Sequence, residues 1–291
     1  MKRLRQETCM SHDRLEDPEH RAAGRTADQP RPPAALEALV DRLQQGLLER
    51  DTAARLLLLA AVAGEHVLLV GPPGTAKSEL ARRLQSLIAG APYFERLLTR
   101  FSTPEELFGP LSLKALEDDR YERLVQGYLP CAGVAFLDEV FKANSAILNT
   151  LLTLLNERQF DNGSTRMSCP LVTLVGASNE TPQDEALLAF HDRFLIRLAV
   201  QPVGESSFRQ LITGELGRGE CTSDASRSAP SALIDPAPEA LHTEELAAWR
   251  EAAHTVGWDE SALEGLQALR TWAQSNRLEV SDRRWRQLGR L

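Results

Sequence analysis

The segment from His66 to Ser78 constrains the fold of this chain more than any other. It starts with the short apolar run His66–Val70, which stops at the glycine- and proline-rich residues 71–74, and the pattern predicts an amphipathic helix from Ser78 to Ala89. A buried strand, a glycine loop and a helix in this order form a unit in which backbone N–H groups can surround phosphate oxygens. The sequence therefore predicts a phosphate-binding loop.

The loop also supplies the side chains that a bound nucleotide needs. We expect Lys77 to reach the β- and γ-phosphates as a point charge and Ser78 to ligate Mg²⁺. Ala76 stands where the strict motif requires glycine, so the match is incomplete, and the alternative is a glycine-rich turn with a solvated lysine. The predicted nucleotide-binding residues here are Gly71, Pro72, Pro73, Gly74, Thr75, Ala76, Lys77 and Ser78.

A second strand-like run, Val134–Leu137, is followed directly by the carboxylates of Asp138 and Glu139. Sheets of α/β proteins bind their ligands at this end of the strands. We expect Asp138 to hold Mg²⁺ through water and Glu139 to polarise the attacking water. An acidic pair after a strand is commonly a helix cap, but its combination with the glycine loop favours the catalytic interpretation.

Three further polar residues suit the attack of water on a nucleotide phosphate. The strand-like run Leu171–Val175 leads to Asn179, which can orient the nucleophilic water if this strand lies between the first two. Arg193 and Arg283 are cations suited to the charge that develops on phosphate, although each alone is more often part of a surface ion pair.

The remaining core elements alternate between strand and helix, which predicts a mainly parallel sheet in an α/β fold. Two helices are expected before the first strand, one over Ala34–Leu48 and one over Leu56–Val62 that Asp51 can cap. Further strands are expected at Tyr93–Thr99 and Leu195–Val200.

Two hairpins are expected to project from this core. Leu111–Ala115 and Tyr121–Val125 flank a stretch of charged residues, and a second hairpin over Arg158–Ser168 turns at Asp161-Asn162-Gly163. Asn-Gly favours such a turn because it tolerates positive φ.

The chain divides into three predicted regions. Residues 1–34 are rich in charge and poor in aliphatic side chains, which predicts a disordered leader, and residues 35–202 form the α/β domain. Residues 203–291 are expected to form a helical lid that contains a flexible linker at 217–238 and is incomplete at its C-terminus. Its helices are expected near Ser206–Leu216, Thr243–Val256 and Ser261–Ser275. We expect the tryptophans to build a compact core in this lid: Trp249, Trp258, Trp272 and Trp285.

Charge and cysteine content exclude several classes. The net charge is -8, from 33 Lys+Arg against 41 Asp+Glu, which argues against a protein whose whole surface is built to hold nucleic acid but leaves a local basic groove open. The cysteines are far apart, which indicates neither a zinc site nor a disulfide framework and fits a reducing cytoplasm. No signal peptide or membrane span is expected from the sequence.

Taken in order, the loop, the Asp-Glu strand end, the asparagine and the two arginines resemble the AAA+ ATPases. The stretch from Ala53 to Leu198 resembles the MoxR branch, with the RavA subgroup closest. The resemblance rests on the segments GPPGTAKSELARRL, TRFSTPEELFGPLS, RYERLVQGYLP, FLDEVFKANSAILNTLLTLLNERQFDNG and ASNE followed by DRFLIRL.

This resemblance implies a P-loop NTPase fold, with a three-layer αβα core and a mainly parallel five-stranded sheet, that uses ATP or ADP with Mg²⁺. It makes Asn179 the sensor 1 residue, Arg193 the arginine finger that serves a neighbouring subunit, Arg197 a weaker finger candidate and Arg283 sensor 2. It also implies an insertion at 111–125 and a hairpin before sensor 1 at 158–168. Family members form hexameric rings that remodel protein complexes as chaperones do, with a partner carrying a von Willebrand factor A (vWA) domain. The similarity fades between Gly214 and Ala240, and RavA-like proteins continue well beyond Leu291.

Other functions stay open at this point. The chain can be an ATP hydrolase that remodels proteins, a nucleotide-binding switch with little turnover, or a chelatase motor subunit, although RYERLVQGYLP and SDRRW favour RavA. A machine that acts on DNA is disfavoured because neither a basic groove nor the activator loop GAFTGA is visible.

Overall fold

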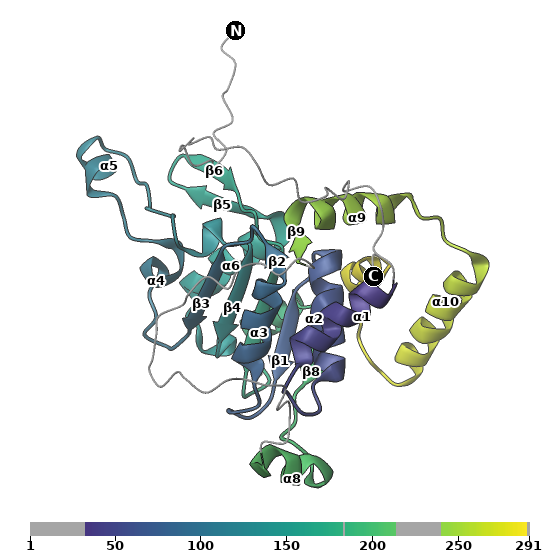
Figure 1. Cartoon of the computed structure of the whole chain (residues 1–291). Coiled ribbons are helices and arrows are strands. Elements are labelled where there is room, and N and C mark those ends of the chain that lie inside the picture. The colour runs from purple at the N-terminus through teal and green to yellow at the C-terminus, as the bar shows by residue number, and fades with distance from the viewer. Residues whose placement is uncertain (1–32, 183, 214–239, 290–291) are drawn as a thin grey trace, which may run out of the picture.

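A five-stranded parallel sheet lies at the centre of the molecule. The computed structural model describes residues 33–182, 184–213 and 240–289 (Figure 1). In space the strands follow the order β3-β4-β7-β1-β8. They are β1 Val67–Val70, β3 Tyr93–Leu97, β4 Val134–Asp138, β7 Thr173–Ser178 and β8 Ile196–Ala199. The predicted α/β fold with a five-stranded parallel sheet is confirmed.

Helices cover both faces of the sheet, so the core has three layers. Along β1, the side chains of Val67 and Leu69 belong to one buried cluster and that of Leu68 belongs to another, because successive residues of a strand face opposite sides. The first cluster is closed by α1 (Pro33–Gln44), α2 (Asp51–Ala63) and α3 (Lys77–Ser86). The second is closed by α4 (Pro104–Phe108), α6 (Ser145–Glu157) and α7 (Glu185–His191).

Two predicted helices differ at their ends. The helix after the loop ends at Ser86, and the chain then forms β2 (Ile88–Ala89), which pairs with β9 (Leu241–His242) from the C-terminal region. The second helix begins at Asp51, so its N-cap is Arg50 and the predicted Asp51 cap is wrong. Pairing between β2 and β9 ties the C-terminal helices to the α/β core.

Of the two predicted hairpins, one is confirmed and one differs. β5 (Gln159–Asn162) and β6 (Thr165–Ser168) pair antiparallel, with Gly163 at φ +66° in the turn. In the other, the short helix α5 (Leu113–Glu117) replaces the first strand, and the flanking segments share one bridge. The reason is local, because Ser112 accepts a hydrogen bond from the Ala115 N–H and so caps a helix.

Of the four C-terminal helices that the structure describes, α9 packs most closely on the α/β core. The four are α8 (Glu205–Thr213), α9 (Thr243–Thr255), α10 (Glu260–Ser275) and α11 (Asp282–Leu288). Leu246 and Trp249 of α9 pack against the cluster that contains α2, whereas α8 and α10 lie at the periphery (Figure 1).

The predicted tryptophan core is therefore wrong. Trp258 and Trp272 are 52% and 57% exposed, and Ala273 is the one buried residue of α10. The apolar side chains Leu246 and Trp249 of α9 pack against the cluster that contains α2 instead of against α10. The predicted linker at 217–238 and the predicted leader, except for its last two residues, lie outside the described residues.

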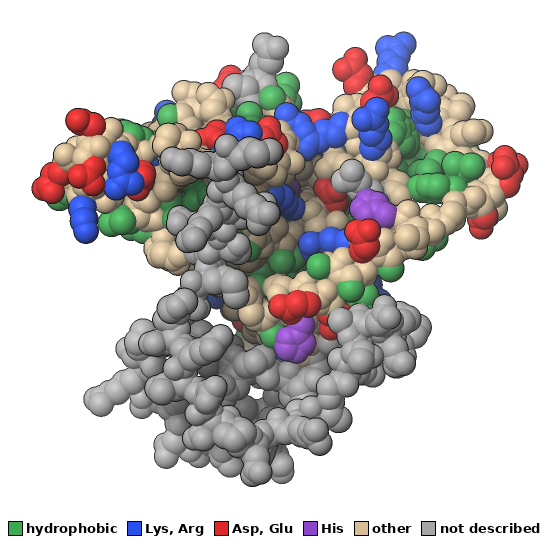
Figure 2. All heavy atoms as spheres, turned by 90° about the horizontal axis from the view of Figure 1, so that it is seen from above, with side chains coloured by type: hydrophobic (Ala, Val, Ile, Leu, Met, Phe, Trp, Pro, Cys, Tyr) green, Lys and Arg blue, Asp and Glu red, His purple; other side chains and the backbone are tan. Residues whose placement is uncertain are grey.

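The face seen in Figure 2 carries acidic and basic side chains intermixed, with no stripe of a single sign. A basic stripe is the electrostatic signature of a surface that binds nucleic acid. No helix in the described ranges has both the length and the apolar character needed to cross a bilayer.

Candidate active site

The register of the parallel sheet brings three polar strand ends to one edge. β7 lies between β1 and β4, with Ser178 opposite Val70 and Gly176 opposite Leu137. The residues that follow these pairs are the start of the glycine loop, Asn179 and the Asp138–Glu139 pair. They meet at the carboxyl edge of the sheet, where α/β proteins bind ligands.

The glycine loop has the backbone conformation of an anion cradle. Gly71 begins it, and a Cβ at this position would lie 2.1 Å from the carbonyl oxygen of Val200, so no larger residue fits there. Gly74 and Ala76 both have positive φ, of 79° and 65°. Ala76 therefore occupies the left-handed conformation that the motif glycine would adopt, at a cost of about 1–2 kcal/mol.

The N–H groups of this loop are open to a ligand. In the described part of the chain, the N–H groups of Gly74, Thr75 and Ala76 donate to no protein acceptor. Because α3 begins at Lys77, the N–H groups of its first turn also have no partner within the helix. Such N–H groups at the start of a helix, together with the helix dipole, form a site for phosphate.

Two side chains donate hydrogen bonds to backbone carbonyls of the loop. Thr75 Oγ1 donates to the carbonyl of Pro72 at 2.9 Å. Arg50 Nε donates to the carbonyl of Thr75 at 3.2 Å, and its Nη2 donates to that of Gln201 at 2.8 Å. Burial lowers the pKa of Arg50, which is 6% exposed. Sequence reasoning missed Arg50, because a single arginine ahead of a helix forms no motif.

The side chain of Lys77 turns back onto the loop that precedes it. Its Nζ donates to the carbonyls of Gly71 at 2.7 Å and Pro72 at 2.8 Å, and to Asn179 Oδ1 at 3.3 Å. The side chain is buried, and burial lowers its pKa, although the carboxylates of Asp138 and Glu139 oppose this shift. The alternative of a merely solvated lysine does not describe this residue.

Glu139 is held from two sides. Asn179 Nδ2 donates to Glu139 Oε1 at 2.5 Å, and Lys142 Nζ lies 3.4 Å from Oε2. The residue precedes the short 3₁₀ helix η2 (Val140–Lys142) at φ +53°, yet its side chain makes no capping hydrogen bond. Asp138 Oδ1 accepts the Glu139 N–H at 2.9 Å. The structure thus joins Lys77, Asn179 and Glu139 in one chain of hydrogen bonds.

Arg193 and Arg283 lie at the amino end of the sheet, opposite the glycine loop. β8 runs parallel to β1 with Ile196 opposite Val67, so Arg193 precedes the amino end of the sheet. Arg193 Nε is buried and has no hydrogen-bond partner among the described residues. The weaker candidate, Arg197, donates to the carbonyl of Phe194 at 3.0 Å.

Arg283 is not near the loop of its own chain. It hydrogen-bonds to Asn156 in the last turn of α6 and lines a cavity with Gly64 and His66, which precede β1. The predicted contact of Arg283 with a nucleotide in the same chain is therefore not supported. The reason is the position of α11, which packs at the amino end of the sheet.

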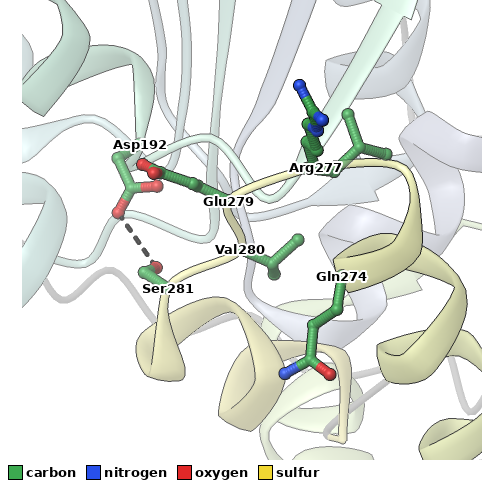
Figure 3. Close-up of a pocket in the computed structure, with 7 residues that line it drawn as sticks. Asp192, Gln274, Arg277, Glu279, Val280 and Ser281 are labelled. Atoms are coloured by element: carbon green, nitrogen blue, oxygen red, sulfur yellow. Dashed lines mark hydrogen bonds between the residues drawn. The ribbon is translucent and has the colours of Figure 1, made fainter.

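Asp192, beside Arg193, anchors this part of the lid. It accepts a hydrogen bond from Ser281 Oγ at 3.3 Å, across the edge of a cavity of about 640 Å³ between the end of α7 and the segment from Gln274 to Ser281 (Figure 3). Arg284 Nε lies 2.7 Å from its Oδ1. Sequence reasoning missed this contact because no spacing links two such distant segments.

The residues at the carboxyl edge fit a magnesium ion that arrives with a nucleotide. Mg²⁺ is held by one or two protein oxygens together with substrate phosphates and water. Ser78, in the first turn of α3, and Asp138, at the end of β4, are oxygen donors at this edge. No group of three or more His, Cys, Asp or Glu side chains able to hold a metal occurs in the described ranges. This sparse donor set suits Mg²⁺ bound through phosphates.

Comparison with known proteins identifies the family of the chain. Residues 34–235, more than half of the chain, match the model of the bpMoxR family, described as the MoxR domain in MoxR-vWA-beta-propeller ternary systems. The RavA subgroup expected from the motifs is not shown by this match and stays a prediction.

Relatives and a solved structure point the same way. An uncharacterized protein of Methanocaldococcus jannaschii, MJ0812, is 52% identical over 169 residues, which cover 58% of this chain and 45% of that protein. Protein MoxR of Paracoccus denitrificans is 31% identical over 153 residues, 50% of this chain and 44% of that protein. The chain thus spans less than half the length of these relatives.

The crystal structure of a candidate ATPase from Cytophaga hutchinsonii shares the fold, with a TM-score of 0.58 at 17% identity over 82% of this chain and 68% of that one. Together with the family match, the loop and the Asp-Glu strand end show that the chain belongs to the MoxR family of AAA+ ATPases.

Proposed function

We propose that this chain hydrolyses ATP with Mg²⁺ at the carboxyl edge of its sheet. The observation that supports this most is the Asn179 amide, which contacts the Lys77 ammonium through its oxygen and the Glu139 carboxylate through its nitrogen. One neutral side chain therefore connects the proposed phosphate contact with the proposed base. Apart from the arginine, each role that a water-attack mechanism requires has a residue at this edge.

Nucleotide binding uses the N–H groups of the glycine loop and the ammonium group of Lys77, which contacts two carbonyls of the same loop. The loop N–H groups receive the phosphate oxygens, and Lys77 exchanges the carbonyls of Gly71 and Pro72 for the β- and γ-phosphates. Because burial already disfavours its charged form, Lys77 gains from an anionic partner. When bound through Ser78 and Asp138, Mg²⁺ supplies positive charge that stabilises the leaving phosphate.

Glu139 acts as general base toward the attacking water. Its Oε1 is occupied by Asn179 and its Oε2 faces Lys142, so the carboxylate becomes available when Lys77 turns toward phosphate and Asn179 changes partner. In that state Asn179 orients the water and Glu139 accepts its proton.

The arginine that completes the site comes from a second copy of the chain. Arg193 cannot reach the loop of its own chain because it lies beyond the amino end of β8. We propose that Arg193 is this arginine finger and that the copies form a ring, with six subunits as in related ATPases.

Steady-state phosphate release at increasing protein concentration, with light scattering on the same samples, tests this function. We expect activity per subunit to rise with concentration together with the mass, and to be lost in Glu139→Gln. Activity that is independent of concentration and arises from a monomer would disprove the shared site.

The biological role proposed for the activity is remodelling of protein complexes. The matched family is described by systems that also contain vWA and β-propeller components, which supports a vWA-domain partner. A protein client that raises ATP turnover would support this role. The contacts of Glu139 with Asn179 and Lys142 favour one alternative, a nucleotide-binding switch with slow turnover. Nucleotide binding without phosphate release would support this alternative.

A further inference from the structure

Arg50, at the N-terminus of α2, contacts both the glycine loop and the segment that follows β8. Its Nε donates to the carbonyl of Thr75 at 3.2 Å, its Nη1 to that of Glu49 at 2.8 Å and its Nη2 to that of Gln201 at 2.8 Å. The residue is 6% exposed, so its guanidinium has protein groups rather than bulk water as partners. Carbonyls from separate parts of the chain therefore hold it in one position.

The Thr75 carbonyl belongs to the same peptide group as the Ala76 N–H. In a trans peptide these two groups point in opposite directions, and no cis peptide occurs among the described residues. Because the guanidinium of Arg50 holds the carbonyl on one side of the loop, the N–H is directed to the other side. That N–H donates to no acceptor in the described part of the chain and is one of the donors proposed for phosphate.

Ala76 makes this orientation of the peptide group harder to keep. Its φ of +65° is a conformation that glycine adopts readily and alanine does not. Rotation of the Thr75–Ala76 peptide group by half a turn would give Ala76 a negative φ, which suits alanine, and would turn the N–H away from the phosphate. The loop therefore needs a contact that opposes this rotation. The hydrogen bond from Arg50 opposes it, and a charged donor makes that bond strong.

The other contacts of Arg50 keep its guanidinium from moving with the loop. The Val200 N–H donates to the carbonyl of Val70 at 2.7 Å, so the segment after β8 runs beside the start of the loop. Gln201, the next residue, accepts from Nη2, and the Arg50 carbonyl accepts the Ala54 N–H at 2.9 Å in the first turn of α2. Arg50 is thus attached to the chain after β8 and to α2, neither of which belongs to the loop.

We propose that Arg50 is a positioning residue for nucleotide binding: by holding the Thr75 carbonyl, it keeps the Ala76 N–H directed at the phosphates. Arg50 itself contacts no phosphate. The inference rests on the proposed function, since it assigns a role at the same loop. The Ala76 N–H holds the nucleotide and moves no proton, so its loss weakens binding before and during the reaction alike. Such a loss raises KM and leaves kcat little changed.

The test compares Arg50→Met with Arg83→Met in the full chain. Arg83, on α3, is the matched control because it also donates to backbone carbonyls, and its partners among the described residues lie outside the loop: Glu79, Leu43 and Gln45. Calorimetry with ADP and Mg²⁺ measures Kd, and phosphate release measures KM and kcat. We expect Arg50→Met to raise Kd and KM at least about tenfold and to change kcat less than about threefold, and Arg83→Met to change all three less than about twofold.

A double variant separates positioning from a general loss of stability. Ala76→Gly removes the strain that favours rotation of the peptide group, so Arg50→Met/Ala76→Gly should bind ADP at least about threefold more tightly than Arg50→Met. An arginine that only stabilised the fold would show no such recovery. Urea unfolding of each variant identifies a temperature at which all are folded.

Arg50→Lys takes the place of Arg50→Met where the latter does not fold. It keeps the charge but lacks the planar group that spans two carbonyls, so Kd for ADP should still rise at least about threefold. An unchanged Kd in Arg50→Lys would overturn the proposal in that case.

Three results would overturn the proposal and leave the proposed function in place. They are a folded Arg50→Met protein that binds ADP as tightly as wild type, a fall in kcat with KM unchanged, and no tighter binding in the double variant. In each of them the wild-type chain still binds ADP and releases phosphate. A wild-type chain that binds no nucleotide would overturn the proposed function and this inference together.

Discussion

The two ends of the central sheet are built from different kinds of contact. At the carboxyl end, Lys77, Asn179 and Glu139 contact one another through side chains that follow three neighbouring strands. At the amino end, the charged side chains of Arg158 and Arg250 donate to backbone carbonyls at the C-terminal end of α2, and Arg250 thereby ties α9 to the core. The first end is arranged for a ligand and its reaction, and the second for the packing of one part of the chain on another.

Because of this difference, we expect substitutions at the two ends to change different properties of the protein, namely turnover and stability. We expect side chains at the carboxyl end to affect mainly turnover, since their partners change in the proposed reaction. Apart from Arg193, the proposed arginine finger, we expect side chains at the amino end to affect mainly stability, since their carbonyl partners are fixed. The variants below separate the two effects.

The largest effect is expected for Glu139→Gln. Loss of the general base should lower kcat by about 10²- to 10⁴-fold, while the free energy of unfolding changes little. Phosphate release and chemical unfolding on the same samples measure both. Glu180→Gln, one residue after Asn179 and exposed, is the control and should keep its activity. A Glu139→Gln protein that retains more than about a tenth of the activity would show that Glu139 is not the base.

His66→Leu is expected to have the largest effect on stability. His66 is buried before β1, where its Nδ1 accepts the Leu174 N–H at 3.0 Å and its Nε2 lies 3.3 Å from the carbonyl of Leu155. Leucine leaves both groups unpaired, which should lower the free energy of unfolding by about 2–4 kcal/mol in urea titrations. His242→Leu, at an exposed position, should cost under about 0.5 kcal/mol, and similar losses in both variants would contradict this account.

The same histidine should make stability depend on pH. Burial and the charge of Arg158 hold the pKa of His66 well below 6.5, so below that pH the unfolded chain binds a proton that the folded chain does not. Stability is therefore complete above about pH 6.5 and falls as the pH drops, by up to about 1.4 kcal/mol per pH unit for one proton. Urea unfolding from pH 7 to 5 should show a shallower slope for His66→Gln than for wild type. Equal slopes would assign the effect to other groups.

A smaller loss is expected for Arg250→Gln. This change removes the hydrogen bonds to Ala61 and Val62, which should lower the free energy of unfolding by about 1–2 kcal/mol and increase amide hydrogen exchange in α9. Arg55→Gln removes an exposed ion pair with Glu37 and should cost under about 0.5 kcal/mol. Unchanged exchange in α9 would show that Arg250 does not anchor this helix.

The smallest effect is expected for Ala76→Gly, at the carboxyl end. Glycine relieves the positive φ of Ala76 but raises the entropy of the unfolded chain, so the two effects should leave the free energy of unfolding within about 1 kcal/mol of wild type. Nucleotide binding should persist, as measured by calorimetry with ADP and Mg²⁺. A loss of binding would show that the alanine side chain itself contributes.

The sequence predicts the carboxyl end of the sheet well because its chemistry is local. The loop follows β1 directly, and the Asp138–Glu139 pair and Asn179 follow β4 and β7, so the order of the strands is enough to bring them together. The amino end is different, because Arg158, Arg250 and Asp192 contact segments far away in the chain or backbone carbonyls, which leave no pattern in the sequence. The same limit explains why the tryptophan core was predicted wrongly and why the position of Arg283 beside Asn156 was not foreseen.

The most direct test of the shared site is the mixing of two inactive variants. Glu139→Gln lacks the base but keeps the arginine, and Arg193→Ala lacks the arginine but keeps the base. If each site takes Arg193 from a neighbouring copy, equal mixtures should regain phosphate release, because some sites then combine an intact Glu139 with an intact Arg193. Mixtures that stay as inactive as either variant alone, at concentrations where light scattering shows mixed assemblies, would contradict the account.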